Sequence, residues 1–219
     1  MKTNLTVYLS AFIFLFSTPC FAQKTEKQTV ESSFFTKADA SNWVSVLKDN
    51  SLKLSEVFIM DNGIMQVTGQ SNGYIRSKKT YSNYELNVEW RWTKSLGNSG
   101  VLVHIQAKDS VWPPCYQSQQ KAEDAGDIIC MSGFKAREMT DTIKFTIKKI
   151  HPSNEKQLGE WNTMKVVCLN NSLKVYVNGL LQNSITGLSA TKGFIGFQNE
   201  GKPLEFRKLS IKEMGTVEK

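Results

Sequence analysis

A strict alternation of apolar and polar residues over Tyr84–Trp92 constrains the fold of this chain more than any other feature. The apolar positions are Leu86, Val88, Trp90 and Trp92, and the positions between them are Glu85, Asn87, Glu89 and Arg91. Because successive side chains of a strand point to opposite faces of a sheet, the pattern predicts a β-strand with one buried and one polar face. No long segment has the apolar periodicity of a helix.

The same alternation recurs in Ile143–Lys148 and Leu173–Asn178. Asn178-Gly179 ends the second segment, and both residues tolerate the positive φ of a type I′ turn, so we expect a hairpin to Leu180–Ile185. The apolar phase shifts by one residue at Arg207-Lys208, which indicates a β-bulge. Many short strands separated by Gly, Asn and Ser turns predict an all-β fold, an antiparallel β-sandwich or jelly roll.

The N-terminal segment has the pattern of a cleaved secretory signal, with Lys2 ahead of an apolar stretch from Val7 to Phe16. We therefore expect a signal peptide at residues 1–22, a flexible leader at 23–33, one β-sandwich domain at 34–214 and a tail at 215–219. The product would be periplasmic or secreted. A lipid anchor on Cys20 is a less favoured alternative, because Ser17 and Pro19 stand where a lipobox usually carries Leu and a small residue.

Composition excludes several classes of function. The chain has 27 Lys and Arg against 20 Asp and Glu, a net charge of +7, but its basic residues are scattered and form no nucleic-acid-binding motif. Beyond the signal, no apolar run is long enough to span a membrane. The phosphate-binding glycine motifs are also missing, so any redox step must occur on another protein. A disulfide between Cys115 and Cys130 would fit an oxidising compartment, but the sequence does not decide it.

The GxSxG and HExxH motifs are missing and the chain has two histidines, which argues against catalysis by a serine triad or a zinc site of the HExxH type. A polar group remains: Glu89 and Arg91 on one strand, Asn98 in the connection, and His104 on the next strand. We expect these neighbouring strands to pair antiparallel, which would let Arg91 and His104 share a sheet face suited to a sugar. The alternative is a solvated face on which His104 makes a structural hydrogen bond.

The segment Ser110–Asp127 is expected to be the longest irregular loop, and it combines rings with amides at Trp112, Gln117 and Gln119. Rings stack on the apolar faces of sugars and amides pair with hydroxyl groups, so the loop is a candidate carbohydrate site. A packed loop that covers a sheet edge is the alternative. Trp161, at the start of a later strand, is expected to be a buried core anchor.

Six short motifs in order resemble the secreted bacterial family once called DUF1080 and now the 3-keto-disaccharide hydrolase domain. They are Asn98-Ser99-Gly100, the Trp112-Pro113 loop ending in Gln119, Ala125-Gly126-Asp127, Gly159-Glu160-Trp161-Asn162, Val177-Asn178-Gly179 and Gly193-Phe194-Ile195-Gly196-Phe197-Gln198. The resemblance, which spans about residues 34–214, implies a concanavalin-like jelly roll. It also implies activity on glycosides whose C3 hydroxyl a separate dehydrogenase has oxidised. Many members carry Glu-x-Gln where this chain has Gln117 before Gln119, and an amide cannot act as a base.

For such a substrate one base, one acid and a group that stabilises an enolate suffice. We expect His104 to be the base, Asp127 or Glu89 to orient it or act as the acid, and Arg91 to stabilise the enolate. Asn98, Trp112, Gln117 and Gln119 would bind the oligosaccharide or glycoside. A divalent cation could assist, although no ligand spacing identifies one. An ordinary glycosidase and a non-catalytic carbohydrate-binding module remain alternatives.

Overall fold

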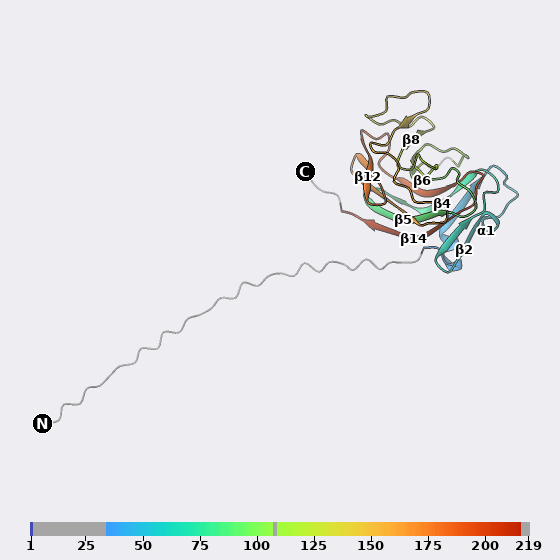
Figure 1. The fold of residues 1–219 in the computed structure, drawn as a ribbon, viewed down its shortest axis with the longest axis horizontal. Coiled ribbons are helices and arrows are strands. Elements are labelled where there is room, and N and C mark those ends of the chain that lie inside the picture. The colour runs from blue at the N-terminus through green and yellow to red at the C-terminus, as the bar shows by residue number, and fades with distance from the viewer. Residues whose placement is uncertain (2–33, 107–108, 216–219) are drawn as a thin grey trace.

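The alternating segment forms strand β5 (Tyr84–Trp92), and its apolar positions are all buried, as predicted. β5 lies in the middle of one of two antiparallel sheets in a computed structural model that describes Met1 and residues 34–106 and 109–215. In Figure 1 the strands β5 and β14 of one sheet lie below the strands β4 and β6 of the other sheet. The predicted all-β sandwich is confirmed, because the two sheets bury a shared apolar core between them.

Helices contribute little to the described residues, which contain a 3₁₀-helix η1 (Lys37–Asn42) and a single-turn helix α1 (Leu54–Val57). The strands other than β5 are β1 (Trp43–Leu47), β2 (Phe58–Asp61), β3 (Ile64–Val67), β4 (Gly73–Tyr81), β6 (Gly100–Ile105), β7 (Cys115–Gln119), β8 (Ile128–Met131), β9 (Thr146–Ile147), β10 (Asn162–Leu169), β11 (Ser172–Val177), β12 (Leu180–Thr186), β13 (Gly193–Asn199) and β14 (Leu204–Glu213).

Sheet A has the order β1-β4-β13-β6-β7-β8-β9, and sheet B has the order β12-β11-β10-β5-β14-β3-β2. The chain crosses repeatedly between the sheets, so β5 is followed by a strand of sheet A and β13 by a strand of sheet B. One face of each sheet packs on the core, and the opposite face of each sheet, called its outer face here, can carry a site.

The two local features of sheet B predicted from the sequence are confirmed. Asn178 and Gly179 have φ of +47° and +83° and join β11 to β12. Lys208 has φ of +51° at a register shift between β14 and β5, which is the predicted bulge.

The prediction of a strand over Ile143–Lys148 is wrong except for the two-residue β9. The Asp141 carboxylate accepts hydrogen bonds from the backbone N–H groups of Ile143 and Lys144 and bends the chain there. Phe145 then takes a φ of +54°, and both Ile143 and Phe145 are exposed. Local side-chain bonding therefore overrides the alternating pattern.

Part of the expected loop Ser110–Asp127 is strand β7, whose residues are all buried. Cys115, Gln117 and Gln119 lie on its outer face, and Tyr116 and Ser118 face the core. A strand covered on both faces shows no apolar alternation, which explains why the sequence pattern did not reveal it.

Cys115 and Cys130 face opposite sides of sheet A, because Cys115 is registered with Met131 and Tyr116 with Cys130. A bridge between them is therefore excluded, and Cys115, Cys130 and Cys168 are all buried free thiols. The predicted leader and, apart from Met1, the predicted signal peptide lie outside the described residues. Among the residues that are described, no helix is long and apolar enough to cross a membrane.

Candidate active site

A cluster of polar side chains lies on the outer face of sheet A where β13, β6 and β7 meet. We call it the amide cluster, and its members are Asn98, Gln117, Gln119, Gln198 and Glu200. The register brings them together, since Gly100 of β6 is paired with Gln119 of β7 and Phe197 of β13 with Val101 of β6. Asn98 and Glu200 form an isolated bridge beyond the strand ends.

Gln117 organises the cluster. Its Nε2 donates to Oε1 of Gln119 at 2.7 Å and to Oε1 of Gln198 at 2.8 Å. Because the amide oxygen of Gln198 is held in this way, its Nε2 is directed to Oε2 of Glu200 at 2.9 Å. Asn98 Nδ2 donates to the same carboxylate oxygen at 2.7 Å. The hydrogen bonds therefore run in one direction, from Gln117 toward Glu200.

Gly100 makes the space that Gln117 occupies. A Cβ atom at Gly100 would lie 2.5 Å from Cγ and 2.6 Å from Nε2 of Gln117. Any larger residue would push the Gln117 amide away from its two partners, because heavy atoms cannot approach so closely. The Asn98-Ser99-Gly100 motif thus has a packing function in the cluster.

Glu200 is the carboxylate of the cluster, and the sequence analysis missed it. It is half-buried, and burial raises the pKa of its carboxyl group above the ordinary value. A base with a raised pKa holds a proton more strongly, which suits proton abstraction near neutral pH. Its position two residues after Gln198, in phase with that residue, was the available signal.

His104 lies in the interior between the sheets, where 1% of its surface is exposed. Its Nδ1 lies 3.0 Å from the carbonyl oxygen of Ala190, and its ring packs edge-on against Tyr84 and Tyr116. Burial lowers its pKa to about 4. The strand alternation fails here because β6 and β13 shift register and His104 has a φ of +55°. Because its ring lies in the core, His104 does not face a substrate on the outer face of sheet A, where the predicted base would have to act.

Glu89 and Arg91 lie on the outer face of sheet B, away from the amide cluster. The expectation that their strand pairs with the next one is wrong, because β5 pairs with β10 and β14, and β6 pairs with β7 and β13. Arg91 forms an ion pair with Glu205, with 2.7 Å between Nη2 of Arg91 and Oε2 of Glu205. Glu89 accepts from Arg207 and Lys208. The chain crosses from one sheet to the other between the two strands, so Arg91 and His104 do not share a face.

Asp127 lies beside Gln119 on sheet A, and the backbone N–H of Gln119 donates to its carbonyl oxygen. Its buried carboxylate accepts from Lys148 Nζ at 2.7 Å and from the backbone N–H of Lys149 at 2.8 Å. Asp127 is thus near the cluster, but its charge is already compensated by a lysine.

The outer face of sheet A continues into an apolar region around Tyr74, Leu102 and Cys115. Arg76 lies on the same face, with its Nε and Nη2 each 2.9 Å from a carboxylate oxygen of Asp109. Trp112 is 41% exposed beside this region, and its carbonyl oxygen accepts from Ser132. The predicted binding residues Asn98, Gln117 and Gln119 are therefore brought together, and no hydrogen bond among the described residues joins Trp112 to the amide cluster.

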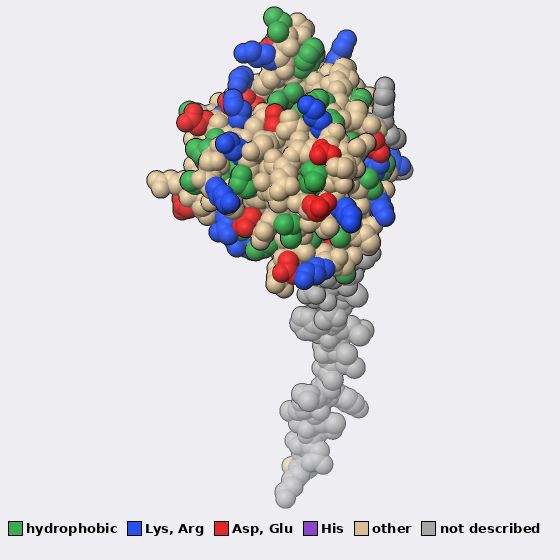
Figure 2. All heavy atoms as spheres, turned by 90° about the vertical axis from the view of Figure 1, so that its right-hand side faces the viewer, with side chains coloured by type: hydrophobic (Ala, Val, Ile, Leu, Met, Phe, Trp, Pro, Cys, Tyr) green, Lys and Arg blue, Asp and Glu red, His purple; other side chains and the backbone are tan. Residues whose placement is uncertain are grey.

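Metal binding has little support in the described part of the chain, where no group of three or more His, Cys, Asp or Glu side chains could hold an ion. The face drawn in Figure 2 shows Lys and Arg side chains interspersed with Asp and Glu side chains. No strongly basic patch of the kind that binds nucleic acid is seen on that face.

Solved structures with a similar fold include enzymes and binding modules. A candidate glycosyl hydrolase from Parabacteroides distasonis is 20% identical, with a TM-score of 0.57, over 78% of this chain and 99% of the other. The carbohydrate-binding module CBM66 from Bacillus subtilis is 11% identical, with a TM-score of 0.55, over 78% and 96%. Alginate lyase A1-II′ is 13% identical, with a TM-score of 0.56, over 85% and 100%. At these identities the likeness concerns the fold.

A comparison with curated proteins found no match. Residues 31–212, most of the chain, match the family described as the 3-keto-alpha-glucoside-1,2-lyase-like domain. This match and the sandwich fold agree with the resemblance seen in the sequence, and the chain belongs to the 3-keto-alpha-glucoside-1,2-lyase-like domain family.

Proposed function

We propose that this protein is a carbohydrate-active enzyme that cleaves glycosides bearing a ketone at C3, and that Glu200 is its base. The observation that carries the proposal is the position of Glu200 in the amide cluster. Its carboxylate is half-buried, has a raised pKa and is held by two amide donors on a single oxygen. The other carboxylate oxygen, Oε1, makes no hydrogen bond to any described residue, so it is the oxygen that would accept the proton from the substrate.

The chemistry needs one base. A C3 ketone acidifies the hydrogen on C2, so the carboxylate can remove that proton. The electrons of the C2–H bond then form a C1=C2 double bond as the C1–O bond breaks, and the departing oxygen takes up a proton. The product is an unsaturated 3-keto sugar, and addition of water at C1 completes a net hydrolysis.

Amide side chains of the cluster supply donors for the sugar and for the developing enolate. Oε1 of Gln119 accepts from Gln117, which leaves Nε2 of Gln119 available to a substrate oxygen. Donors fixed before substrate arrives stabilise developing charge without further reorganisation.

An ordinary glycosidase is less well supported by this face. That chemistry uses two carboxyl groups about 5–9.5 Å apart on either side of the bond that breaks. The other carboxylate near the cluster is Asp127, next to β8, whereas Glu200 follows β13. The strands β6 and β7 lie between β13 and β8, so three strand spacings, about 14 Å, separate the two backbones. Its ion pair with Lys148 further disfavours a free second carboxylate.

A non-catalytic carbohydrate-binding module is the second candidate. Gln117 favours it, because the family resemblance seen in the sequence implies a carboxylate at that position in many members. A cluster of amides would bind a sugar without transforming it, and the same sandwich fold occurs in a binding module.

The test is turnover of a matched pair, 4-nitrophenyl 3-keto-α-glucoside and 4-nitrophenyl α-glucoside. We expect the wild-type protein to consume the 3-keto substrate alone, and Glu200→Gln to reduce its turnover by about 10²-fold or more, the usual contribution of a general base. Deuterium at C2 should slow the wild-type reaction, because the C2–H bond breaks in the proposed step.

Glu155→Gln is the matched control. Glu155 is also half-buried with a pKa raised by burial, but it is bonded to Ser153 and to the backbone N–H of Ala125. It should keep wild-type turnover. Equal cleavage of both glycosides would instead indicate an ordinary glycosidase, and binding without consumption would indicate a binding module. Near-full activity in Glu200→Gln would contradict the assignment of the base.

The proposed substrate implies a separate dehydrogenase that oxidises the C3 hydroxyl. The signal pattern of the N-terminal segment supports export of this chain. Fractionation of the cells that make the protein tests the second point, with processing after Ala22 as the expected result. A full-length product in the cytoplasm would contradict it.

A further inference from the structure

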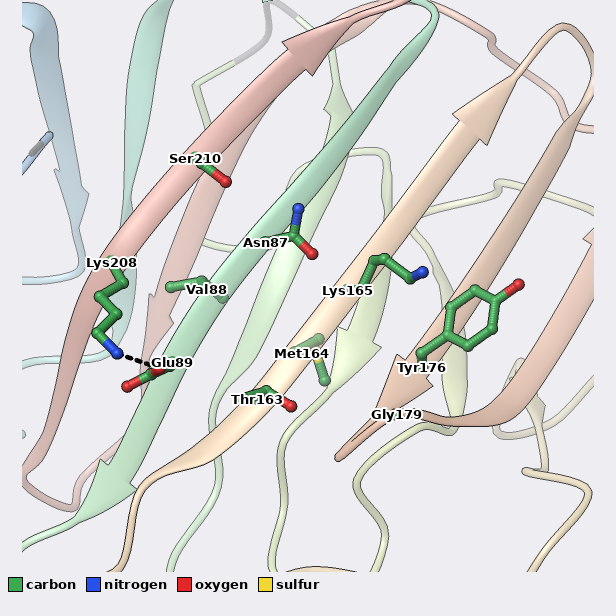
Figure 3. A pocket seen from close by; sticks show the side chains of 10 residues that line it. All are labelled: Asn87, Val88, Glu89, Thr163, Met164, Lys165, Tyr176, Gly179, Lys208 and Ser210. Atoms are coloured by element: carbon green, nitrogen blue, oxygen red, sulfur yellow. Dashed lines mark hydrogen bonds and ion pairs between the residues drawn. The ribbon is translucent and has the colours of Figure 1, made fainter. Parts of the chain in front are cut away.

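A polar groove of about 490 Å³ crosses the outer face of sheet B, far from the amide cluster. Four strands build it, in the order β11, β10, β5 and β14. Their registers place Tyr176 opposite Lys165, Lys165 opposite Asn87, and Asn87 opposite Ser210. Figure 3 shows these four side chains side by side across the strands. At about 4.8 Å per strand the row is about 14 Å long, enough for more than one sugar ring.

Asn87 and Lys165 occupy the middle of the row, and Tyr176 and Ser210 stand at its two ends (Figure 3). Lys208 lies on the same strand as Ser210. Asn87 donates through Nδ2 to Glu85 at 3.0 Å, which leaves its Oδ1 free to accept. Hydroxyl groups at Thr163, Tyr176 and Ser210 have no hydrogen-bond partner among the described residues and add donors and acceptors.

The charges of the groove are unequal. Glu89, its carboxylate, accepts from Nε of Arg207 at 2.6 Å and from Nζ of Lys208 at 2.9 Å, so two cations offset one anion. Lys165 lies with Nζ 4.3 Å from the centre of the Tyr176 ring and forms no ion pair with a described residue. An uncompensated ammonium therefore lies beside an aromatic ring in the middle of a hydroxyl-rich groove.

We propose that this groove is a second carbohydrate site, which binds an acidic oligosaccharide through Lys165. A uronate or sulfate group on the glycan would pair with the ammonium, and hydroxyl groups of adjoining sugars would bond to Asn87, Thr163 and Ser210. Charge complementarity selects this occupant, because a neutral glycan leaves Lys165 without a counter-ion. The groove lies on sheet B and the amide cluster lies on sheet A, so the groove can hold an acidic glycan while the amide cluster binds its own substrate.

Isothermal titration of the full chain tests the proposal with three oligosaccharides of equal length, one uronate, one sulfated and one neutral. We expect an acidic probe to bind at least about tenfold more tightly than the neutral probe, the worth of a charge-assisted hydrogen bond. Whichever of the uronate and sulfated probes binds more tightly identifies the anionic group that the groove prefers. Binding should weaken as salt is added.

Lys165→Gln and Lys165→Glu should each weaken binding of that acidic probe about tenfold or more, with the second change the larger. Lys48→Glu is the control, because Lys48 is an exposed lysine at the end of β1 in sheet A and gives the same change in net charge. Equal affinity for acidic and neutral probes, an unchanged affinity in both Lys165 variants, or the same loss in Lys48→Glu would each overturn the proposal.

Discussion

The buried imidazole of His104 should make the stability of the domain depend on pH in a range where most side chains do not titrate. Nδ1 of His104 donates to the carbonyl oxygen of Ala190, and Nε2 is buried without a hydrogen-bond partner among the described residues. Since a carbonyl oxygen can only accept, Nδ1 carries a proton, and the pKa lowered by burial leaves Nε2 without one near neutral pH. Protonation of Nε2 would place a charge in the core without a counter-ion.

The direction of the effect follows from the two pKa values. Burial lowers the pKa of His104 from 6.5 to about 4 in the folded protein. Between these values the unfolded chain binds a proton that the folded chain does not bind, so acid favours unfolding. The stabilising contribution of the neutral ring is therefore complete above pH 6.5, and it is lost as the pH falls toward 4.

The magnitude follows from about 1.4 kcal/mol for each pH unit between the two pKa values. The full contribution is about 3 kcal/mol, and about 2 kcal/mol of it is lost between pH 7 and pH 5. Few small domains have more than about 15 kcal/mol of total stability, so this loss is measurable.

Urea unfolding followed by tryptophan fluorescence at pH 7 and pH 5 measures the effect. The variant is His104→Asn, because asparagine accepts the φ of +55° at this position and does not titrate. The variant will be less stable at both pH values, since it loses packing against Tyr84 and Tyr116. The informative quantity is the change with pH, which should be about 2 kcal/mol smaller in the variant than in the wild type.

The exposed His151 supplies the control, and His151→Asn should retain the wild-type change with pH. If His104→Asn and the wild type lost the same free energy of unfolding between pH 7 and pH 5, the neutral buried ring could not be the cause. The structural account of His104 would then have to be abandoned.

Three further results are expected. Turnover of a 3-keto-glycoside should rise with pH through one ionisation above the ordinary range of a glutamate, because burial raises the pKa of Glu200; a flat profile would contradict this. Gly100→Ala should lower kcat with little loss of secondary structure by circular dichroism, since its Cβ would displace the Gln117 amide; wild-type kcat would contradict this. Trp90→Ala should reduce the free energy of unfolding in urea by about 3–5 kcal/mol, because Trp90 is fully buried; a loss below about 1 kcal/mol would contradict this.

The sequence pattern predicted elements that bury one face and expose the other. β5 and the β11–β12 hairpin are of this kind, since alternation and the Asn178-Gly179 turn are local properties. It did not predict β7, because both faces of that strand are covered. The pairing of β5 with β10 and β14 was also hidden, since strands that cross between sheets find partners far away in the sequence.

The candidate site was predicted in part for the same reasons. Gln117 and Gln119 were identified by residue type, and the strand register does bring them together with Asn98. His104 was placed on the outer face because alternate residues of a strand share a face. That rule cannot predict a bulge that turns one side chain into the core. Glu200 was missed because its contacts depend on the bridge to Asn98, about a hundred residues earlier in the chain.

The amide at position 117 and the carboxylate at position 200 belong to one hydrogen-bonded path, and this bears on the departure from Glu-x-Gln. Gln117 donates to Gln198, and Gln198 donates to Glu200. A carboxylate at position 117 could not make the first of these bonds, and it would add a second negative charge to the same path. Like charges so close would raise one pKa strongly, so one carboxylate at a time is the favourable arrangement. Gln117 is therefore compatible with a working base, provided that the base is Glu200.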